Sequence, residues 1–242
     1  MIALRKAMVL AAGLGTRMRP LTDNLPKPLL PLDGRSLLDH ALDRLAEAGV
    51  TEAVVNAHWF ADKVAAAVAE RSHPRIHLQR EETLLETGGG VTLALPRLGG
   101  APFAVVNGDA FWLCGPTPAL TRLAAAFDEE GMDGLLLLVR TTQVEGAVGR
   151  GDFMLDPLGR LRRPREREIA PYLFGGVQIL SPRLFRDAPQ GAFSLNRLYD
   201  RAIEAGRLCG LVHDGVWFHL STPADLDKAE EQLRAGLTRA LF

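Results

Sequence analysis

The chain has 242 residues, of which 47% are hydrophobic, and a formal net charge of −1. These values favour one globular domain that spans residues 1–242. They exclude a strongly basic protein of the kind that binds nucleic acid or the surface of an acidic membrane. No apolar run approaches the ~20 residues of a membrane span. The N-terminus is charged too early for a signal peptide, so we expect a cytoplasmic protein with Cys114 and Cys209 as free thiols.

The first predicted element is a buried strand over residues 7–12, which runs into a loop containing Gly13 and Gly15. Arg17 and Lys27 follow within a short distance. Glycines let a backbone approach a ligand closely, and arginine and lysine suit phosphate oxygens. The loop has neither the third glycine of a dinucleotide fingerprint nor the Gly-Lys-Ser/Thr of a Walker loop. It is therefore a candidate nucleoside polyphosphate site, and an ordinary turn with exposed cations is the alternative.

The next segments alternate between helix and strand. They are a helix between an N-cap at Ser36 and Gly49, a strand over 53–56, a helix over 61–70 and a strand over 76–79. Alternation predicts a mostly parallel sheet with helices on both faces, in which ligands bind at the carboxyl ends of strands. Asn56 and His58 fall there, and we interpret them as strand-end polar groups rather than ligand contacts.

Three consecutive glycines, residues 88–90, precede a helix predicted over residues 91–95. Such a run costs backbone entropy, which favours close approach to a flat ligand over a merely flexible loop. A strand over residues 103–106 then ends in Asn107-Gly108-Asp109. By itself this tripeptide is a turn signature, but a carboxylate at a strand end also suits a hard cation such as Mg²⁺.

The second half of the chain continues with less regular spacing. It is predicted to hold a helix over 117–130, strands over 134–140 and 172–180, and a helix over 194–205. Two short strands over 208–213 and 216–219 are predicted to form a hairpin that turns at Asp214-Gly215. A last helix is predicted to be capped by Thr222, with a capping role also for Asp225. Arginines cluster over residues 160–167, interleaved with acids. Because aromatics for base stacking are missing there, we expect a solvated hairpin rather than an RNA-binding patch.

The motif Gly13-x-Gly15-Thr16-Arg17-x-Arg19-Pro20-Leu21-Thr22, followed by Pro26-Lys27-Pro28-Leu29, resembles the signature of the sugar-phosphate nucleotidyltransferases. The resemblance covers about residues 5–235. It implies an α/β fold of the three-layer α/β/α Rossmann-like kind, with a mixed, mostly parallel sheet. It also implies that residues 1–110 mainly bind the nucleotide and residues 111–242 mainly bind the sugar phosphate.

The resemblance implies roles for individual residues. Arg17 and Lys27 would act on the phosphates as catalytic residues, and Asp109 would hold Mg²⁺, with Mn²⁺ as the alternative. The nucleotide would contact Ala11, Ala12, Gly13, Gly15, Thr16, Arg17, Lys27, Glu86, Thr87, Gly88 and Asn107, and the sugar phosphate would contact Gly176 and Val177. Many relatives also use the lysine of a Glu-Lys-Pro element on the sugar phosphate. This chain has Arg163-Pro164 nearby and no such lysine, and one of the clustered arginines is a candidate substitute.

The chain departs from the family near its end. The family pattern Trp-x-Asp-x-Gly-Thr-Pro, whose Asp is the second metal ligand, reads Trp217-Phe218-His219-Leu220-Ser221-Thr222-Pro223 here. Imidazole is a poor ligand for Mg²⁺ and suits Zn²⁺ or Mn²⁺ better. His219 could bind the metal through water, coordinate a softer metal directly or donate to a phosphate. We favour a water-mediated or phosphate role.

The activity implied by the resemblance joins a nucleoside triphosphate and a sugar 1-phosphate to give a nucleotide sugar and pyrophosphate. Among short members, the sequence is similar to uridylyltransferases that act on N-acetylmuramate 1-phosphate in cell-wall recycling. Guanylyltransferases that use mannose 1-phosphate are the alternative. A catalytically weakened nucleotide-sugar sensor is a further alternative, because of His219 and Ser221. We expect no nucleic-acid or membrane partner and a monomer or homodimer.

Overall fold

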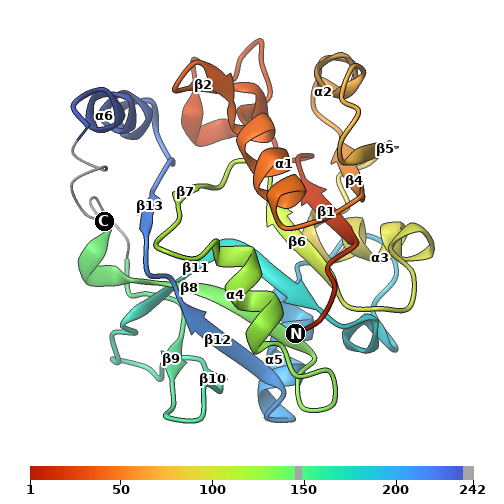
Figure 1. Cartoon of the computed structure of the whole chain (residues 1–242), viewed down its shortest axis with the longest axis vertical. Helices are drawn as coiled ribbons and strands as arrows, with labels where there is room; N and C mark the ends of the chain where they lie inside the picture. The colour runs from red at the N-terminus through yellow and green to blue at the C-terminus, as the bar shows by residue number, and fades with distance from the viewer. Residues whose placement is uncertain (145–148, 237–242) are drawn as a thin grey trace.

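A mixed sheet forms the centre of the computed structural model, which describes residues 1–144 and 149–236. Its seven strands lie in the order β12 (Leu208–Val212), β8 (Gly134–Arg140), β11 (Tyr172–Leu180), β6 (Phe103–Asn107), β1 (Lys6–Leu10), β4 (Glu52–Ala57) and β5 (Arg75–Arg80) (Figure 1). β11 runs antiparallel to both its neighbours, and the remaining pairs are parallel. The predicted mixed, mostly parallel sheet is confirmed.

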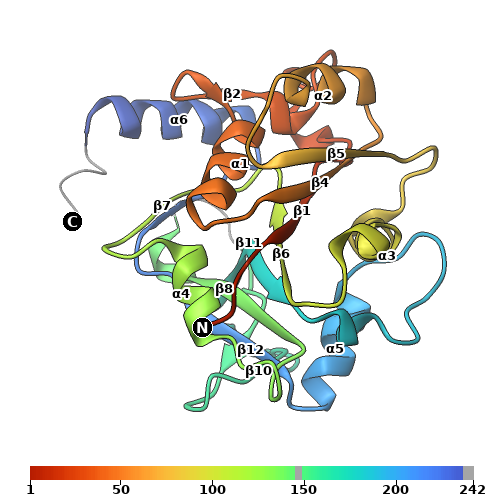
Figure 2. The ribbon, with the colours of Figure 1, turned by 45° about the vertical axis from the view of Figure 1, so that its right-hand side comes forward.

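Helices cover both faces of this sheet, as the alternation of helix and strand predicts. They are α1 (Leu37–Glu47), α2 (Ala61–Val68), α3 (Glu86–Leu98), α4 (Ala119–Ala126) and α5 (Asn196–Glu204). A sixth helix, α6 (Pro223–Arg234), packs in a separate cluster. Side chains alternate along a strand, so Ala7 and Val9 of β1 pack with α1, α2 and α4, while Met8 packs with α3 and α5. The helices therefore form layers on opposite faces, which confirms the three-layer architecture (Figure 2).

A third hydrophobic cluster joins the two ends of the chain. It contains Met18 from the N-terminal region, Phe111 from β7 (Phe111–Leu113), Phe218 from β13 (Val216–Phe218) and Leu226 from α6. Near it, β2 (Pro31–Leu32) and β3 (Arg35–Ser36) form a small hairpin beside α6, as Figure 1 shows. Burial of this cluster holds the C-terminal helix against the segment that follows the first strand.

The predicted hairpin at Asp214-Gly215 is wrong. β12 instead extends the main sheet beside β8, and β13 pairs antiparallel with β7. Gly215 lies against β7 so tightly that a Cβ there would come within 2.0 Å of the Leu113 carbonyl oxygen. The chain therefore crosses from one sheet to the other at these residues. β12 buries Leu208 and Cys209 in the core of the main sheet, whereas β13 buries Phe218 in the third cluster.

Other sequence predictions hold with shifted ends. Ser36 caps α1 by accepting the Asp39 N–H, and Thr222 and Asp225 form a reciprocal capping box at α6. The helix predicted over residues 117–130 is shorter, since α4 ends at Ala126 and Phe127 is extended. Cys114 and Cys209 are free thiols. Among the described residues, no helix combines the length and apolar character needed to cross a membrane.

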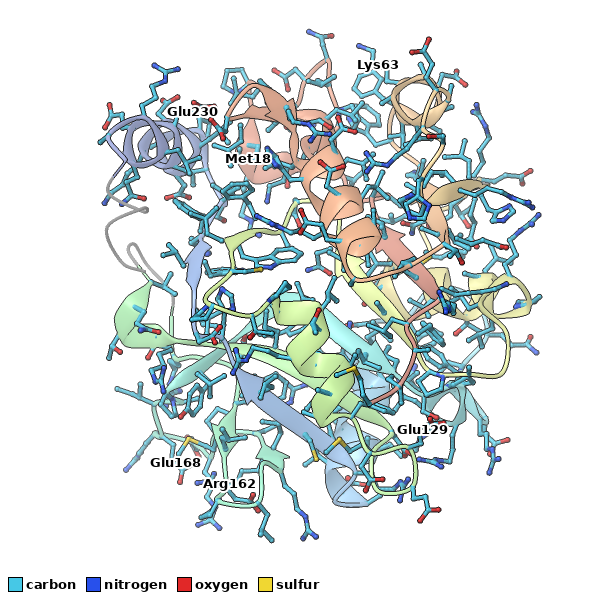
Figure 3. All side chains as sticks on the ribbon, viewed as in Figure 1. Met18, Lys63, Glu129, Arg162, Glu168 and Glu230 are labelled. Carbon is cyan, nitrogen blue, oxygen red and sulfur yellow. The ribbon has the colours of Figure 1, made fainter. Side chains whose placement is uncertain are left out.

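The arginine-rich segment forms the predicted exposed hairpin, from β9 (Met154–Leu155) and β10 (Leu161–Arg162). Hydrogen bonds from Arg162 hold the pKa of Glu168 at about 2, and Arg163 pairs with Asp200 at 2.8 Å. Figure 3 shows Arg162 and Glu168 at the opposite end of the molecule from Met18. Arg162 therefore stabilises its own hairpin, and Arg163 joins the hairpin to α5.

Asp133 ties together the starts of two sheet strands. It precedes β8, and its Oδ1 accepts from Arg183 Nε at 2.7 Å and from Arg207 Nε, just before β12, at 2.9 Å. Burial favours the neutral carboxyl, but the hydrogen bonds from both arginines outweigh it and hold the pKa of Asp133 below its usual value. The charged carboxylate therefore stabilises the folded state.

We expect Asp133→Asn to lower the free energy of unfolding by about 1–3 kcal/mol at pH 7, because two guanidinium groups lose their charged acceptor. A depressed folded-state pKa gives stability that is present above the unfolded pKa of about 3.9 and is lost as pH falls through the folded pKa. The difference between wild type and variant should therefore shrink below about pH 4. Urea unfolding at neutral and acidic pH measures it, and a pH-independent difference would contradict the ion-pair explanation.

Candidate active site

The loop after β1, residues 11–15, is here called the glycine loop. It leads into a short 3-10 helix, η1 (Thr16–Met18). Gly15 adopts φ +62°, and a Cβ there would lie 3.0 Å from Lys27 Cβ, so a larger residue would be strained. Thr22 Oγ1 donates to the Gly15 carbonyl at 2.8 Å. The loop is thereby folded back onto the segment that carries Lys27.

A cavity of about 530 Å³ opens beneath the glycine loop, and we call it the loop cavity. Its lining comprises Leu10, Ala12, Gly13, Leu14, Gly15, Thr16, Arg17, Met18, Lys27, Pro28, Asn56, Leu84, Glu86, Thr87, Asn107, Asp109, Ser194 and Ser221. Most of the predicted nucleotide contacts are in this set. Asn56 also lines this cavity. From the sequence it is interpreted as a strand-end polar group rather than a ligand contact, and the structure gives it both a hydrogen bond within the protein and a place in the cavity wall.

Ala11 and Gly88 lie outside the cavity linings formed by the described residues. The Ala11 N–H donates to Asn56 Oδ1 at 2.7 Å, and the Gly88 N–H donates to the Phe193 carbonyl at 2.8 Å. Their backbone donors are thus already bound within the protein. A nucleotide contact at these two residues stays a prediction.

The predicted start of α3 at residue 91 is wrong, because glycines 88–90 all lie inside this helix. A Cβ at Gly88 would come within 2.3 Å of the Phe193 ring, and one at Gly89 within 2.3 Å of the Gly191 carbonyl oxygen. Gly90 would place a Cβ 2.9 Å from Asn56 Nδ2. These glycines therefore let α3 pack closely on other segments of the same chain, and the predicted close approach to a flat ligand stays a prediction.

Lys27 and Asp109 form the closest charged pair in the cavity wall. Lys27 begins the 3-10 helix η2 (Lys27–Leu29), and Asp109 follows the end of β6. Lys27 Nζ donates to Asp109 Oδ2 at 2.5 Å, and the lysine side chain is only 12% exposed. A mostly buried ammonium thus neutralises the carboxylate that the sequence singles out.

A second cavity of about 550 Å³, the outer cavity, is lined by Arg17, Gly149, Asp152, Leu173, Phe174, Trp217, His219, Ser221, Thr222 and Asp225. A small one of about 150 Å³, the connecting cavity, is lined by Arg17, Lys27, Asn107, Asp109, Ala110, Phe174, Gly175, Gly176, Trp217, Phe218, His219, Leu220 and Ser221. Arg17 and Ser221 line all three cavities. The three cavities therefore meet at these two residues.

A bulge in β11 explains the different positions of the two predicted sugar-phosphate residues. The pairing with β8 shifts between Phe174 and Gln178, and Gly176 there has φ +77°. Gly176 faces the connecting cavity, where a Cβ would lie 3.1 Å from Asn107 Nδ2. Val177 is buried in the core of the sheet. A direct contact of Val177 with a ligand stays a prediction.

His219 and Asp109, predicted as metal-binding residues, border the same connecting cavity. The His219 ring lies beside Trp217, with ring centroids 5.8 Å apart. Among the described residues, no three His, Cys, Asp or Glu side chains gather as a metal site. One carboxylate nevertheless fits an ion that brings phosphate ligands, since Mg²⁺ commonly binds one or two carboxylates plus substrate phosphates.

Sequence reasoning missed several wall residues of the outer cavity. Asp152 accepts the Phe174 N–H at 2.9 Å across the start of β11, and Trp217 Nε1 donates to the Gly175 carbonyl at 3.0 Å. Both contacts join segments far apart in the chain. Trp217 belongs to the C-terminal family motif, so the sequence offered a signal by which its place in the site could have been predicted. The residues around Asp152 form no motif, so nothing in the sequence marked Asp152 as a site residue.

Comparisons with known proteins agree with this geometry. Residues 7–170 match the MobA-like NTP transferase domain family. An N-acetylmuramate alpha-1-phosphate uridylyltransferase of Caulobacter vibrioides is 45% identical over 94% of this chain and 96% of its own length. The same enzyme of Neisseria meningitidis is 35% identical over 93% and 96%, respectively. More distant relatives include mannose-1-phosphate guanyltransferases.

A solved structure of UDP-glucose pyrophosphorylase complexed with UDP-glucose superposes with a TM-score of 0.81 at 17% identity, covering 96% of this chain and 99% of that one. This likeness supports the fold. The family match and the two close relatives go further, because they extend over most of the sequence. The chain belongs to the MobA-like NTP transferase family and is a nucleotidyltransferase.

Proposed function

We propose that this protein transfers a nucleotide from a nucleoside triphosphate to a sugar 1-phosphate, with UTP and N-acetylmuramate 1-phosphate as substrates. The observation that carries the proposal is the meeting of the three cavities at Arg17 and Ser221, next to Lys27 and Asp109. The loop cavity would take the triphosphate and the outer cavity the sugar phosphate. The activity of the two uridylyltransferase relatives supports the choice of substrates.

The two halves of the chain line different cavities. Apart from Ser194 and Ser221, the loop cavity is lined by residues 10–109. Apart from Arg17, the outer cavity is lined by residues 149–225. We therefore assign residues 1–110 mainly to the nucleotide and residues 111–242 mainly to the sugar phosphate, within one domain. Arg17, which reaches both cavities, would contact phosphates of both substrates.

In the proposed reaction, an oxygen of the sugar 1-phosphate attacks the α-phosphorus of the nucleotide. A P–O bond forms there, the bond to the β-phosphate breaks and pyrophosphate leaves. The attacking oxygen is already ionised at neutral pH, so no general base is needed. The protein must align two phosphates in line and offset their mutual repulsion, and Arg17 and Lys27 carry the charges for this.

Asp109 would hold Mg²⁺, or Mn²⁺ as the alternative, and a bound ion would neutralise phosphate charge in the transition state. In the structure Asp109 is bound by Lys27 at 2.5 Å. The lysine therefore competes with a metal for Oδ2 of this carboxylate. Phosphate oxygens of an arriving nucleotide would offer the lysine a replacement partner.

The arginines over residues 160–167 are weak candidates for the missing Glu-Lys-Pro lysine. Arg162 and Arg163 have acidic partners in Glu168 and Asp200, and the part of the chain that the structure describes places no arginine of this segment in a cavity wall. Arg17 lines the outer cavity instead. We assign the contact with the sugar phosphate to Arg17.

The experiment that tests the function measures pyrophosphate release for UTP, GTP, CTP and ATP, each combined with N-acetylmuramate, mannose and glucose 1-phosphates. We expect the highest kcat/KM for UTP with N-acetylmuramate 1-phosphate. Highest activity with GTP and mannose 1-phosphate would replace the proposed substrates with those of the guanylyltransferases. Nucleotide-sugar binding without pyrophosphate release from any pair would favour the sensor, which His219 and Ser221 motivate.

The substrates also suggest a cytoplasmic protein.

His219→Asp should tighten Mn²⁺ binding in the absence of nucleotide by about tenfold or more, because affinity rises with the number of charged oxygen ligands. Residue 219 and Asp109 border the same connecting cavity, so the substitution would place a second carboxylate in its wall. Calorimetric titration of nucleotide-free protein measures the affinity, with His219→Asn as the uncharged control. Equal affinity in wild type and His219→Asp would place residue 219 outside reach of the metal.

A further inference from the structure

Glu81 is a buried carboxylate with no role in the reaction described above. It directly follows β5 and is only 6% exposed. Among the described residues it has no cationic partner, and its oxygens accept from Asn56 Nδ2 at 2.7 Å, Leu85 N–H at 3.1 Å and Gln79 Nε2 at 3.5 Å. Burying a carboxylate is costly unless hydrogen bonds compensate it. A carboxylate held by neutral donors alone therefore calls for an explanation.

One oxygen of Glu81 fixes the orientation of the Asn56 amide. A carboxylate accepts hydrogen bonds and does not donate them, so Asn56 must turn its Nδ2 toward Glu81. Its Oδ1 then faces the opposite way and accepts the Ala11 N–H at 2.7 Å. Ala11 is the first residue of the glycine loop. Through Asn56, which is 2% exposed, Glu81 thus holds the start of that loop.

The other oxygen of Glu81 holds the opposite wall of the loop cavity. Oε2 accepts the N–H of Leu85, the residue immediately before α3. Glu86, next in the chain, has φ +58° and lines the cavity together with Thr87. A left-handed conformation at a non-glycine residue is unfavourable and needs support from its surroundings. The hydrogen bond to Leu85 supplies that support at the adjacent residue.

The last glycine of the run completes this arrangement. A Cβ at Gly90 would lie 2.9 Å from Asn56 Nδ2 and 3.0 Å from Glu81 Oε1. Gln79 Nε2 also donates to the Gly90 carbonyl at 2.9 Å. α3 can therefore pack directly over the Asn56–Glu81 hydrogen bond and shield it from water because residue 90 has no side chain.

We propose that Glu81 is a positioning residue that holds the two walls of the nucleotide cavity in register. It acts through Asn56 on the glycine loop and through Leu85 on Glu86 and Thr87. The assignment of this cavity to a nucleotide rests on the proposed function. Glu81 itself lines none of the three cavities formed by the described residues, but Asn56, Glu86 and Thr87 line the loop cavity and neither of the other two. Its effect should therefore fall on nucleotide binding and spare the sugar phosphate.

Glu81→Gln tests this with little change in size. The amide keeps one acceptor oxygen and places an NH2 donor where the other was, so it cannot accept from both Asn56 Nδ2 and the Leu85 N–H. We expect the Kd and KM for the nucleotide to rise roughly tenfold, the scale of one lost charged hydrogen bond. The kcat and the KM for the sugar 1-phosphate should stay within about twofold. Glu82→Gln, at the exposed neighbouring glutamate, is the matched control and should behave as wild type.

Gly90→Ala is the second variant, in case Glu81→Gln folds poorly. Alanine favours a helix over glycine, so α3 itself should not be weakened, yet the added methyl must push against Asn56 and Glu81. We expect the same selective rise in nucleotide Kd. Asn56→Ala combined with Glu81→Gln should cost less than the sum of the two single changes, because both break one connection.

Direct titration with UTP and GTP, in the absence of any sugar phosphate, separates the possible failures. If wild type binds neither nucleotide, the proposed function is overturned and Glu81 has no such role. If wild type binds one and Glu81→Gln binds it equally well, the positioning role alone is overturned. A variant in which kcat and both KM values change together would also overturn it, because that pattern indicates a general loss of structure.

Discussion

Lys27→Ala is expected to lower kcat/KM by about 100-fold or more, the scale of losing one electrostatic stabiliser of a transition state. Lys27 lines both the loop cavity and the connecting cavity, and its ammonium is largely shielded from solvent. In that setting a positive charge acts on phosphates more strongly than it would in water. Steady-state pyrophosphate release measures the loss.

Lys63→Ala is the control for this substitution. Lys63 lies on α2 at the outer edge of the molecule, as Figure 3 shows, and donates to the Asn24 carbonyl. Its removal should leave kcat/KM unchanged. Activity of Lys27→Ala within a few-fold of wild type would exclude a role for Lys27 in the reaction.

Because Lys27 is paired with Asp109, metal binding gives a second measurement on the Lys27→Ala variant. Without the ammonium at 2.5 Å, the Asp109 carboxylate loses its positive partner and is free to bind a cation. Lys27→Ala should therefore bind Mn²⁺ without nucleotide more tightly than wild type, even though it turns over more slowly. Loss of both activity and metal binding would indicate collapse of the site rather than removal of one charge.

Asp109→Asn should reduce turnover by about 100-fold or more, because the amide keeps the size of the side chain but removes the charge that would hold Mg²⁺. We expect no recovery at ordinary Mg²⁺ concentrations. Measuring kcat over a range of Mg²⁺ concentrations tests this, with Asp62→Asn on the surface as a control. A variant with wild-type turnover at the wild-type Mg²⁺ concentration would show that the metal is held elsewhere.

Features that depend only on neighbouring residues could be predicted from the order of amino acids. The strand before the glycine loop, the alternation of helix and strand, and the caps at Ser36 and Thr222 all follow from local patterns, and the structure confirms them. The gapped motif around Arg17 and Lys27 was also sufficient to place both residues in one cavity wall. Turn geometry, helix caps and side-chain periodicity act over a few residues, so they are visible in the order of amino acids.

The connections between distant segments became visible only in the folded structure. It placed β13 against β7 instead of β12, and it put glycines 88–90 inside a helix. It also joined Glu81 to Ala11 through Asn56, so that a residue without any motif holds a wall of the site. Strand pairing and buried hydrogen bonds depend on which surfaces are brought together when the core closes. A local pattern does not specify that partner, because several pairings would satisfy the same residues.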